Sequence, residues 1–250
     1  MKIVVCVKQV PDTETRIKIG ADGRSIDTAE VEWVVNPYDE YAVEEALQIK
    51  ERTGEGEVVI VSVGEERAAT AIRSCLAMGA DRGILLKSET PFGDAYAAAS
   101  ALAAVLKEVE FDILFFGKQA VDDDNAQVSS LVAQMLDLPC VTVVTKLKLA
   151  DGKAVAHREV EGGTELVETS LPAVFTAEKD LNQPRYASLK GIMTAKKKQI
   201  EEKEPHLGDA KVEVIEMLKP PPRPAGRVVG EGKEAVPELV HLLRDEAKVI

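Results

Sequence analysis

The sequence contains few of the residues that mark several common classes of protein. Its 250 residues include 3 cysteines, 3 histidines and 1 tryptophan, and aromatic residues make up 4%. Cys6, Cys75 and Cys140 lie far apart and are odd in number, which argues against a disulfide framework. The histidines are equally scattered, so no zinc site is visible. The shortage of aromatic residues also argues against a surface that stacks the bases of a nucleic acid.

Basic residues and long apolar runs are also scarce. The 31 Lys and Arg residues against 43 Asp and Glu residues give a net charge of −12, the wrong sign for binding a nucleic-acid backbone. No run approaches the ~18 consecutive apolar residues that suggest a membrane span. The apolar run at residues 3–6 is too short for a signal peptide and predicts a strand. These absences predict a soluble, reduced, acidic protein of the cytoplasm, with no nucleic-acid partner and no membrane insertion.

Two periodicities alternate over the first 180 residues. Short runs rich in β-branched or aromatic residues predict strands buried in a parallel sheet at residues 3–10, 58–63, 83–87, 112–116 and 140–145. Apolar stripes at helical spacing, several of them rich in alanine, predict helices at residues 39–52, 66–78, 94–106 and 125–136. Strands and helices in alternation predict an α/β fold with a doubly wound, mostly parallel sheet.

The pattern changes after residue 145. Alternating apolar and polar residues at 146–149, 155–160 and 164–169 predict an antiparallel meander at the edge of the sheet, and residues 171–176 predict a return to a buried strand. From about residue 205 the chain is rich in proline, and residues 220–226 can be neither helix nor central strand. A short helix is expected at 236–245. We therefore expect an α/β domain at residues 1–204 and, at 205–250, an arm that packs on this chain or on a partner.

Neither standard phosphate-binding motif is present. The sequence has no G-x-x-x-x-G-K-[ST] and no G-x-G-x-x-G. It does have helix starts after strands, which converge at the carboxyl ends of the strands in a doubly wound sheet. At the first, Asn36 suits the N-cap, Pro37 suits the first helical position and Asp39 can complete a capping box. The free amides of this helix start could instead meet a ribose or a base.

A second helix start, at residues 117–129, carries three consecutive aspartates, Asp122 to Asp124. Its free amides and partial positive charge suit a phosphate. The aspartates could instead simply cap the helix. A divalent metal is a third interpretation, but a single run of carboxylates is a weak metal signal.

The only basic concentration lies at residues 182–198. It contains Arg185, Lys190 and the run Lys196 to Lys198, with apolar residues at helical spacing among them. Such lysines can be a solvated surface. An apolar anchor surrounded by positive charge also suits transient docking of an acidic partner.

No catalytic constellation is visible beside these segments. No histidine lies near a candidate nucleophile, and Cys6 is expected to be a buried strand residue. Any chemistry would therefore come from a bound cofactor.

Five segments together resemble one known family. They are residues 7–12 (Val-Lys-Gln-Val-Pro-Asp), 36–46, 76–82, 117–124 and 182–198. In this order, along nearly the whole chain, they resemble the beta subunit of an electron-transfer flavoprotein.

The resemblance implies a Rossmann-like, adenine-nucleotide-binding fold and an electron carrier rather than an enzyme. It implies a heterodimer whose alpha subunit holds most of a redox-active FAD, while the beta subunit binds a structural AMP. Acyl-CoA dehydrogenases of fatty acid beta-oxidation, or related flavoproteins, would reduce the FAD, and a quinone oxidoreductase would receive the electrons. The proline-rich arm would wrap onto the alpha subunit.

The resemblance also implies site residues. The cofactor-binding residues would be Cys6, Asn36, Pro37, Tyr38, Asp39, Val63, Gly117, Gln119, Ala120, Val121, Asp122, Asp123, Asp124, Asn125, Ala126, Gln127 and Val128. The partner-docking residues would be Tyr186, Leu189 (the apolar anchor), Ile192, Met193, Lys196, Lys197 and Lys198. No catalytic residue and no metal ligand is expected.

Two alternatives remain at this point. The run from Ala126 to Val128 resembles the electron-bifurcating branch of the family, in which a second FAD replaces AMP, although Asp122 to Asp124 favours AMP. A tyrosine that touches the flavin in some relatives aligns with Thr13.

A nucleotide-binding protein of the universal-stress type is the other alternative, but it would lack the proline-rich arm. An ATP pyrophosphatase is excluded because residues 10–13 do not form its phosphate loop.

Overall fold

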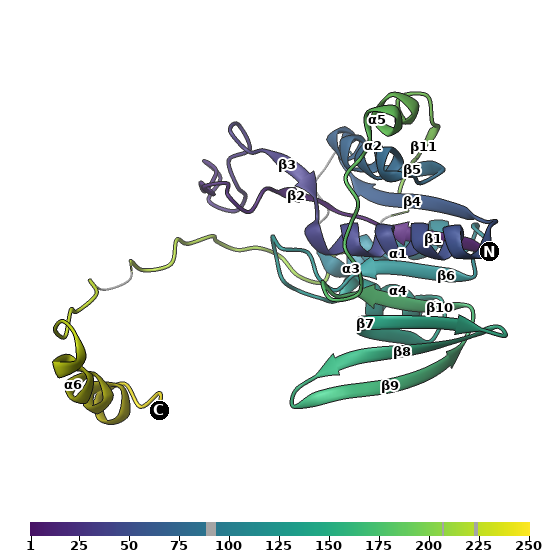
Figure 1. Cartoon of the computed structure of the whole chain (residues 1–250). Coiled ribbons are helices and arrows are strands. Elements are labelled where there is room, and N and C mark those ends of the chain that lie inside the picture. The colour runs from purple at the N-terminus through teal and green to yellow at the C-terminus, as the bar shows by residue number, and fades with distance from the viewer. Residues whose placement is uncertain (89–93, 207, 223–224) are drawn as a thin grey trace. The chain divides into compact units, whose positions relative to one another are not determined.

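The computed structural model describes residues 1–88, 94–206, 208–222 and 225–250, which form two compact units, Met1–Glu216 and Met217–Ile250. Unit 1 is built on a nine-stranded sheet of order β11-β5-β4-β1-β6-β10-β7-β8-β9 (Figure 1). Its strands are β1 (Lys2–Cys6), β4 (Glu57–Gly64), β5 (Arg82–Lys87), β6 (Ile113–Gly117), β7 (Cys140–Ala150), β8 (Lys153–Val160), β9 (Gly163–Ser170), β10 (Ala173–Ala177) and β11 (Ile200–Lys203). The strands from β11 to β7 pair in parallel, as the unalternating apolar runs predicted.

Helices cover both faces of this sheet, which confirms the α/β fold class. They are α1 (Pro37–Thr53), α2 (Ala69–Met78, preceded by the 3-10 turn Glu66–Ala68), α3 (Ala95–Leu106), α4 (Val128–Met135) and the short α5 (Leu189–Ala195). The predicted helices lie within a few residues of the first four. None of the helices in the described part of the chain combines the length and the apolarity of a membrane span.

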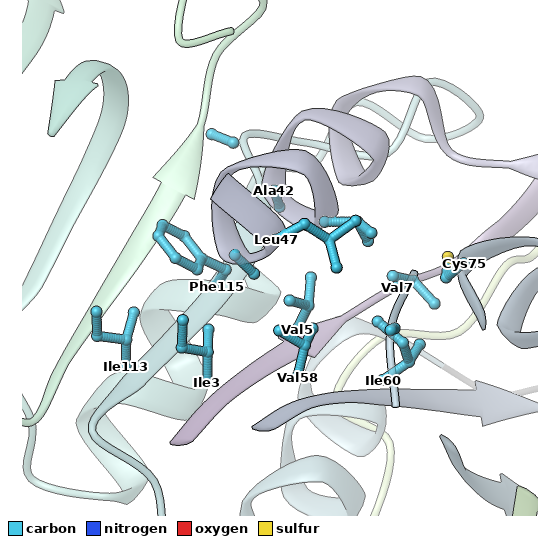
Figure 2. Packing of buried hydrophobic residues seen from close by; sticks show 14 of the residues in the cluster. Ile3, Val5, Val7, Ala42, Leu47, Val58, Ile60, Cys75, Ile113 and Phe115 are labelled. Atoms are coloured by element: carbon cyan, nitrogen blue, oxygen red, sulfur yellow. The ribbon is translucent and has the colours of Figure 1, made fainter. Parts of the chain in front are cut away.

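Alternate residues of each central strand serve the two faces of the sheet. Ile3 and Val5 of β1 pack with α1 and α2, whereas Val4 and Cys6 pack with α3 and α4. Figure 2 shows Ile3, Val5 and Leu47 meeting in the first of these two cores. Every residue from Val58 to Val61 of β4 is fully buried, because both of its faces are covered.

The edge meander was also predicted correctly. Strands β7, β8 and β9 pair antiparallel, and β9 lies at the edge of the sheet. The two predicted strands at 140–145 and 146–149 are one strand, β7, whose first half pairs in parallel with β10 and whose second half pairs with β8. The register shifts between Val144 and Lys146, and Val143 has φ +59°, so a β-bulge carries the strand from one pairing to the other.

Three strands differ from the predicted pattern. The predicted strand 3–10 divides after β1, and its second part becomes β2 (Gln9–Pro11), which pairs with β3 (Trp33–Val35) in a separate small sheet. Strand β3 and strand β11 were not predicted. Strand β11 is short and rich in charged residues, and its conformation comes from parallel pairing with β5.

The first compact unit, Met1–Glu216, includes residues that hydrogen bond to the start of α3. Asp94 Oδ1 caps α3 by accepting from Ala97 N (2.8 Å), while its Oδ2 accepts from the amides of Lys211 and Val212 (2.5 and 2.8 Å). The first part of the proline-rich segment is thereby held on α3. Of the predicted proline-rich run, residues 223–224 lie outside the described residues.

The second unit contains the expected C-terminal helix. It is α6 (Val236–His241), continued by a π-helical turn at Leu242–Glu246. The side chains of Leu218, Val228 and Val236 in this unit are exposed.

Candidate functional site

The carboxyl ends of the parallel strands lie together at one edge of the sheet. Strand β1 stands between β4 and β6, so the chain winds away from β1 in one direction through β4 and β5, and in the other through β6 and β10. Such a point of reversal leaves a crevice at the carboxyl ends, where ligands of doubly wound sheets bind. Residues 6–8 and 117–121 lie at this point, at the carboxyl ends of β1 and β6, and we call this region the edge site.

Asp39, in the first turn of α1, ties three elements together at the edge site. Its Oδ2 accepts from the Lys8 amide (2.7 Å), and its Oδ1 accepts from the Gly117 amide (3.0 Å) and from Asn36 Nδ2 (2.9 Å). Burial raises the pKa of Asp39 to about 7, although the three donated hydrogen bonds oppose that rise. The carboxyl group therefore changes charge near neutral pH inside a fixed polar network.

Asn36 has a different role from the predicted one. It stands at the N-cap position of α1, with Pro37 in the first turn as expected, but its side chain makes no capping hydrogen bond. Instead its Nδ2 also donates to Gln119 O (2.9 Å), and its Oδ1 accepts from Val121 N (3.1 Å). Asn36 thus holds the loop that follows β6.

Gly117 permits the close approach of α1 to the end of β6. A Cβ atom at this position would lie 2.3 Å from Asp39 Oδ1 and 2.7 Å from the carbonyl carbon of Tyr38. No side chain fits there. Gly117 was predicted as a cofactor-binding residue, but the local sequence does not reveal this packing requirement.

The three aspartates do not cap α4. The N-cap of α4 is Gln127, and no side chain caps it. Lys8 Nζ pairs with Asp122 Oδ1 (2.8 Å) and Asp123 Oδ2 (3.1 Å), while Gln119 Nε2 donates to Asp124 Oδ1 (2.6 Å). The capping interpretation of this run is therefore wrong for α4.

Lys8 was not among the predicted site residues, and its contact with the aspartates spans more than a hundred residues of sequence. Partial burial opposes its charged form, but Asp122 and Asp123 hold the pKa of Lys8 above its ordinary value. The ion pairs offset the negative charge that stands beside a candidate phosphate site.

The start of α4 offers backbone donors. Its first intrahelical hydrogen bond runs from Leu131 N to Gln127 O (3.0 Å), so the amides of residues 128–130 have no partner within the helix. Asp124 and Ala126 have φ of +52° and +51°, which bends the loop before the helix. A helix start without a side-chain cap and with its nearest carboxylates paired fits an anionic group such as a phosphate.

Three apolar members of the predicted site, Cys6, Val63 and Val128, lie on the α3 and α4 side of the sheet. Cys6 belongs to the core on that side, and Val63 and Val128 are partly buried against the same core. Burial raises the pKa of the Cys6 thiol well above its ordinary value, so the thiol stays protonated. These side chains can give a ligand an apolar wall.

Metal ligands do not gather at the edge site or elsewhere in the described ranges. Across residues 1–88, 94–206, 208–222 and 225–250, no group of three or more His, Cys, Asp or Glu residues is arranged to hold an ion. Thr13 lies apart, in an open hollow of about 850 Å³ where Asp12, Glu14, Glu30 and Glu32 outnumber the nearby cations.

The predicted docking residues form an exposed apolar surface on and beside α5. Tyr186 is 100% exposed, Leu189 84% and Met193 71%, and Ile192 is exposed as well. Ser188 caps the helix by accepting from the Gly191 amide (3.0 Å). We call Tyr186, Leu189, Ile192 and Met193 the docking surface.

The segment before the docking surface is anchored to α1. Asn182 Nδ2 donates to Tyr41 O (3.0 Å), and the Arg185 guanidinium pairs with Glu44 (2.8 Å) and Glu51 (2.5 Å). These contacts join the basic segment to the sheet domain across more than 130 residues of sequence.

The three predicted docking lysines are not equivalent. Lys196 and Lys197 are exposed. The Lys198 ammonium turns inward and donates to the backbone oxygens of Leu76 (3.1 Å) and Ala80 (2.5 Å). The structure therefore does not place the charge of Lys198 on the docking surface, because carbonyls at the end of α2 bind it.

Comparison with known proteins decides the family. The family model described as the electron transfer flavoprotein domain matches residues 24–207. The electron transfer flavoprotein subunit beta of Bacillus subtilis is 43% identical over the full length of both chains, and that of Syntrophomonas wolfei is 42% identical over 100% of this chain and 98% of its own. The chain belongs to the electron transfer flavoprotein beta-subunit family.

Beta subunits of electron transfer flavoproteins are electron carriers rather than enzymes. Family membership implies an alpha-subunit partner and the involvement of a flavin. A caffeyl-CoA reductase-Etf complex subunit, CarD of Acetobacterium woodii, is 44% identical over 78% of this chain and 75% of that protein.

Proposed function

We propose that this beta subunit, with its alpha subunit, takes electrons from acyl-CoA dehydrogenases of fatty acid beta-oxidation or related flavoproteins and delivers them to a quinone oxidoreductase. An FAD held mainly by the alpha subunit supplies the redox chemistry. The beta chain contributes a nucleotide site, a docking surface and an arm. We place this activity in the cytoplasm.

The edge site would hold a structural AMP. The observation that carries this proposal is the start of α4, whose amides at residues 128–130 lack intrahelical partners and stand beside aspartates already paired with Lys8 and Gln119. These amides would hold the phosphate. Asn36 and Asp39 would keep the surrounding loop in place, and Cys6 and Val63 would supply apolar contact.

A second FAD in place of AMP is the alternative. Val128 has no hydroxyl group with which to hold a phosphate, so backbone amides would carry more of that contact. One relative is named as a subunit of a caffeyl-CoA reductase-Etf complex. Both observations are compatible with a bifurcating subunit.

Nucleotide content separates the two candidates. The heterodimer would be purified and denatured, and its released nucleotides quantified by chromatography. One FAD and one AMP per heterodimer is the result expected for the carrier. Two FAD without AMP would overturn it in favour of the bifurcating alternative.

The docking surface would meet the donor flavoprotein, with Leu189 as its apolar anchor. Its support is the exposure of four large apolar side chains on one short segment, beside the exposed Lys190, Lys196 and Lys197. The arm would pack on the alpha subunit, which would cover exposed apolar residues such as Leu218 and Val228.

A further inference from the structure

Two basic side chains link α2 and α5. Each of them binds backbone carbonyl oxygens at or just beyond the end of the other helix. Arg73 of α2 donates from Nη1 to Ala195 O (2.5 Å) and Lys198 O (2.7 Å), at the end of α5. Lys198, just beyond α5, donates from Nζ to Ala80 O (2.5 Å) and Leu76 O (3.1 Å), at the end of α2. We call this pair of contacts the reciprocal clamp.

Both halves of the clamp bring a cation to the end of a helix. Ala195 O and Leu76 O lie in the last turns of α5 and α2, where backbone carbonyls carry partial negative charge and the helix dipole favours a cation. The other two acceptors, Lys198 O and Ala80 O, lie just beyond the two helices. Burial and the nearby Lys50 lower the pKa of Lys198, although Asp81 opposes that shift. Lys198 is thus a partly desolvated residue in contact with backbone oxygens.

The packing between the two helices leaves little freedom for α5. A Cβ atom on Gly191 would lie 2.3 Å from Ala77 O, so the backbone of α5 rests directly on the end of α2. Ala195 is 1% exposed and belongs to the core that α2 shares with the sheet. The buried side of α5 is fixed, while Leu189 and Met193 stay exposed.

We propose that Arg73 and Lys198 are positioning residues that fix the orientation of α5 and thereby set the affinity of the docking surface for its donor flavoprotein. The inference rests on the proposed docking function. It gives Lys198 a role distinct from that of its neighbour Lys197, although the two carry the same charge. Lys197 would attract an acidic partner, whereas Lys198 would hold the helix that the partner contacts.

The test compares these two lysines in the purified, FAD-loaded heterodimer. The variants are Lys198→Met and Arg73→Met, with Lys197→Met as the matched loss of charge. Deuterium exchange of residues 189–195 reports on α5, and steady-state electron transfer from a reduced acyl-CoA dehydrogenase gives kcat and KM. Circular dichroism and FAD content establish that each variant is folded.

We expect Lys198→Met and Arg73→Met to raise the exchange rate of residues 189–195 and to raise KM about 10-fold, as the loss of a charge-assisted hydrogen bond permits, with kcat changed less than about twofold. Lys197→Met should leave the exchange rate unchanged. Lys198→Arg keeps the donors and should restore both properties. Equal exchange and equal KM in Lys198→Met and Lys197→Met would overturn the inference, because Lys198 would then act only as a charge.

Leu189→Ala separates this inference from the proposed docking function. If Leu189→Ala raises KM while Lys198→Met does not, the clamp is refuted and docking stands. If Leu189→Ala leaves KM unchanged, the docking proposal itself fails, and the clamp's effect on affinity fails with it.

Discussion

The edge site and the docking surface are built on opposite principles. At the edge site, buried polar groups from three elements converge on Asp39, and backbone amides provide much of the hydrogen bonding. On the docking surface, apolar side chains from one segment stand in solvent, and polar contacts hold the segment from behind. One region hides its polar groups, and the other exposes its apolar groups.

Because of this difference, substitutions in the two regions should affect stability and function differently. A change at the buried part of the edge site, around Asp39 and Gly117, disturbs groups shielded from water, so it should lower the free energy of unfolding as well as ligand binding. A change at an exposed side chain such as Leu189 removes few internal contacts, so it should alter the encounter with a partner and leave stability within about 0.5 kcal/mol.

Gly117→Ala should give the largest effect. The new methyl group would lie 2.3 Å from Asp39 Oδ1 and would force α1 away from β6. Overpacking of this kind costs about 1–3 kcal/mol, and loss of the Asp39 hydrogen bonds adds to it. Urea unfolding of the heterodimer should show the loss, together with a reduced nucleotide content.

Gly163→Ala is the matched control. A Cβ atom there meets nothing within 4 Å, so the free energy of unfolding should change by less than about 0.5 kcal/mol. Equal losses in the two variants would contradict the view that the edge site is tightly packed at Gly117.

Gly117 also shows what the sequence could and could not reveal. The central strands were predictable because burial on both faces leaves unbroken β-branched runs such as residues 58–61. The need for glycine at 117 depends on α1, which lies some 78 residues earlier in the chain. Local patterns gave the location of this site but not its packing.

The partners of the charged residues also could not be predicted from local sequence patterns. Asp122 and Asp123 suit a helix cap by sequence alone, and Lys198 suits an exposed lysine run. The two aspartates instead pair with Lys8, and Lys198 binds the carbonyl oxygens of Leu76 and Ala80, in each case across more than 100 residues of sequence. Strand β11 was missed for the same reason, because its pairing with β5 outweighs its polar composition.

Lys8→Met should give the next largest effect, at the edge site. It leaves Asp122 and Asp123 unpaired beside the proposed phosphate position, so we expect AMP affinity to fall about 10-fold. Stability should change little, because the ion pairs are partly exposed and such pairs contribute about 0–1 kcal/mol. Calorimetric titration of nucleotide-depleted heterodimer with AMP measures the change.

Lys18→Met provides the comparison for this prediction. Lys18 pairs with Glu30, in an exposed contact away from the edge site, so its loss should leave AMP affinity unchanged. If both variants bind AMP like the unaltered protein, Lys8 has no part in the nucleotide site.

A smaller effect is expected when salt is added to the transfer assay. Lys190, Lys196 and Lys197 surround the docking surface, and ions screen exposed charges over about 10 Å at 0.1 M. Raising the ionic strength from about 0.05 to about 0.5 M should lower kcat/KM several-fold, by slowing the encounter. A rate independent of salt would mean that these lysines are only a solvated surface. Replacing all three by alanine should flatten the dependence, whereas Lys107→Ala should not.

We expect the smallest effect, a shift of amide proton resonances, from the titration of Asp39 itself. Because the pKa of this carboxyl is raised to about 7, the amides of Lys8 and Gly117 should donate to a neutral group below that pH and to a carboxylate above it. Hydrogen bonds to a charged acceptor are shorter and stronger. The two amide proton resonances should therefore move downfield together as the pH rises, with a shared midpoint of about 7.

The same titration determines the direction in which the free energy of unfolding changes with pH. A carboxyl whose folded pKa lies above its ordinary value of 3.8 binds its proton more tightly in the folded chain. The contribution of Asp39 to the free energy of unfolding is therefore fully present below that ordinary value and is lost as the pH rises through about 7. The Val121 amide, which donates to Asn36 rather than to Asp39, is the internal control and should move much less. If the Lys8 and Gly117 amide resonances did not move across this range, Asp39 would not change its charge near neutral pH, and the predicted pH dependence of the edge site would be wrong.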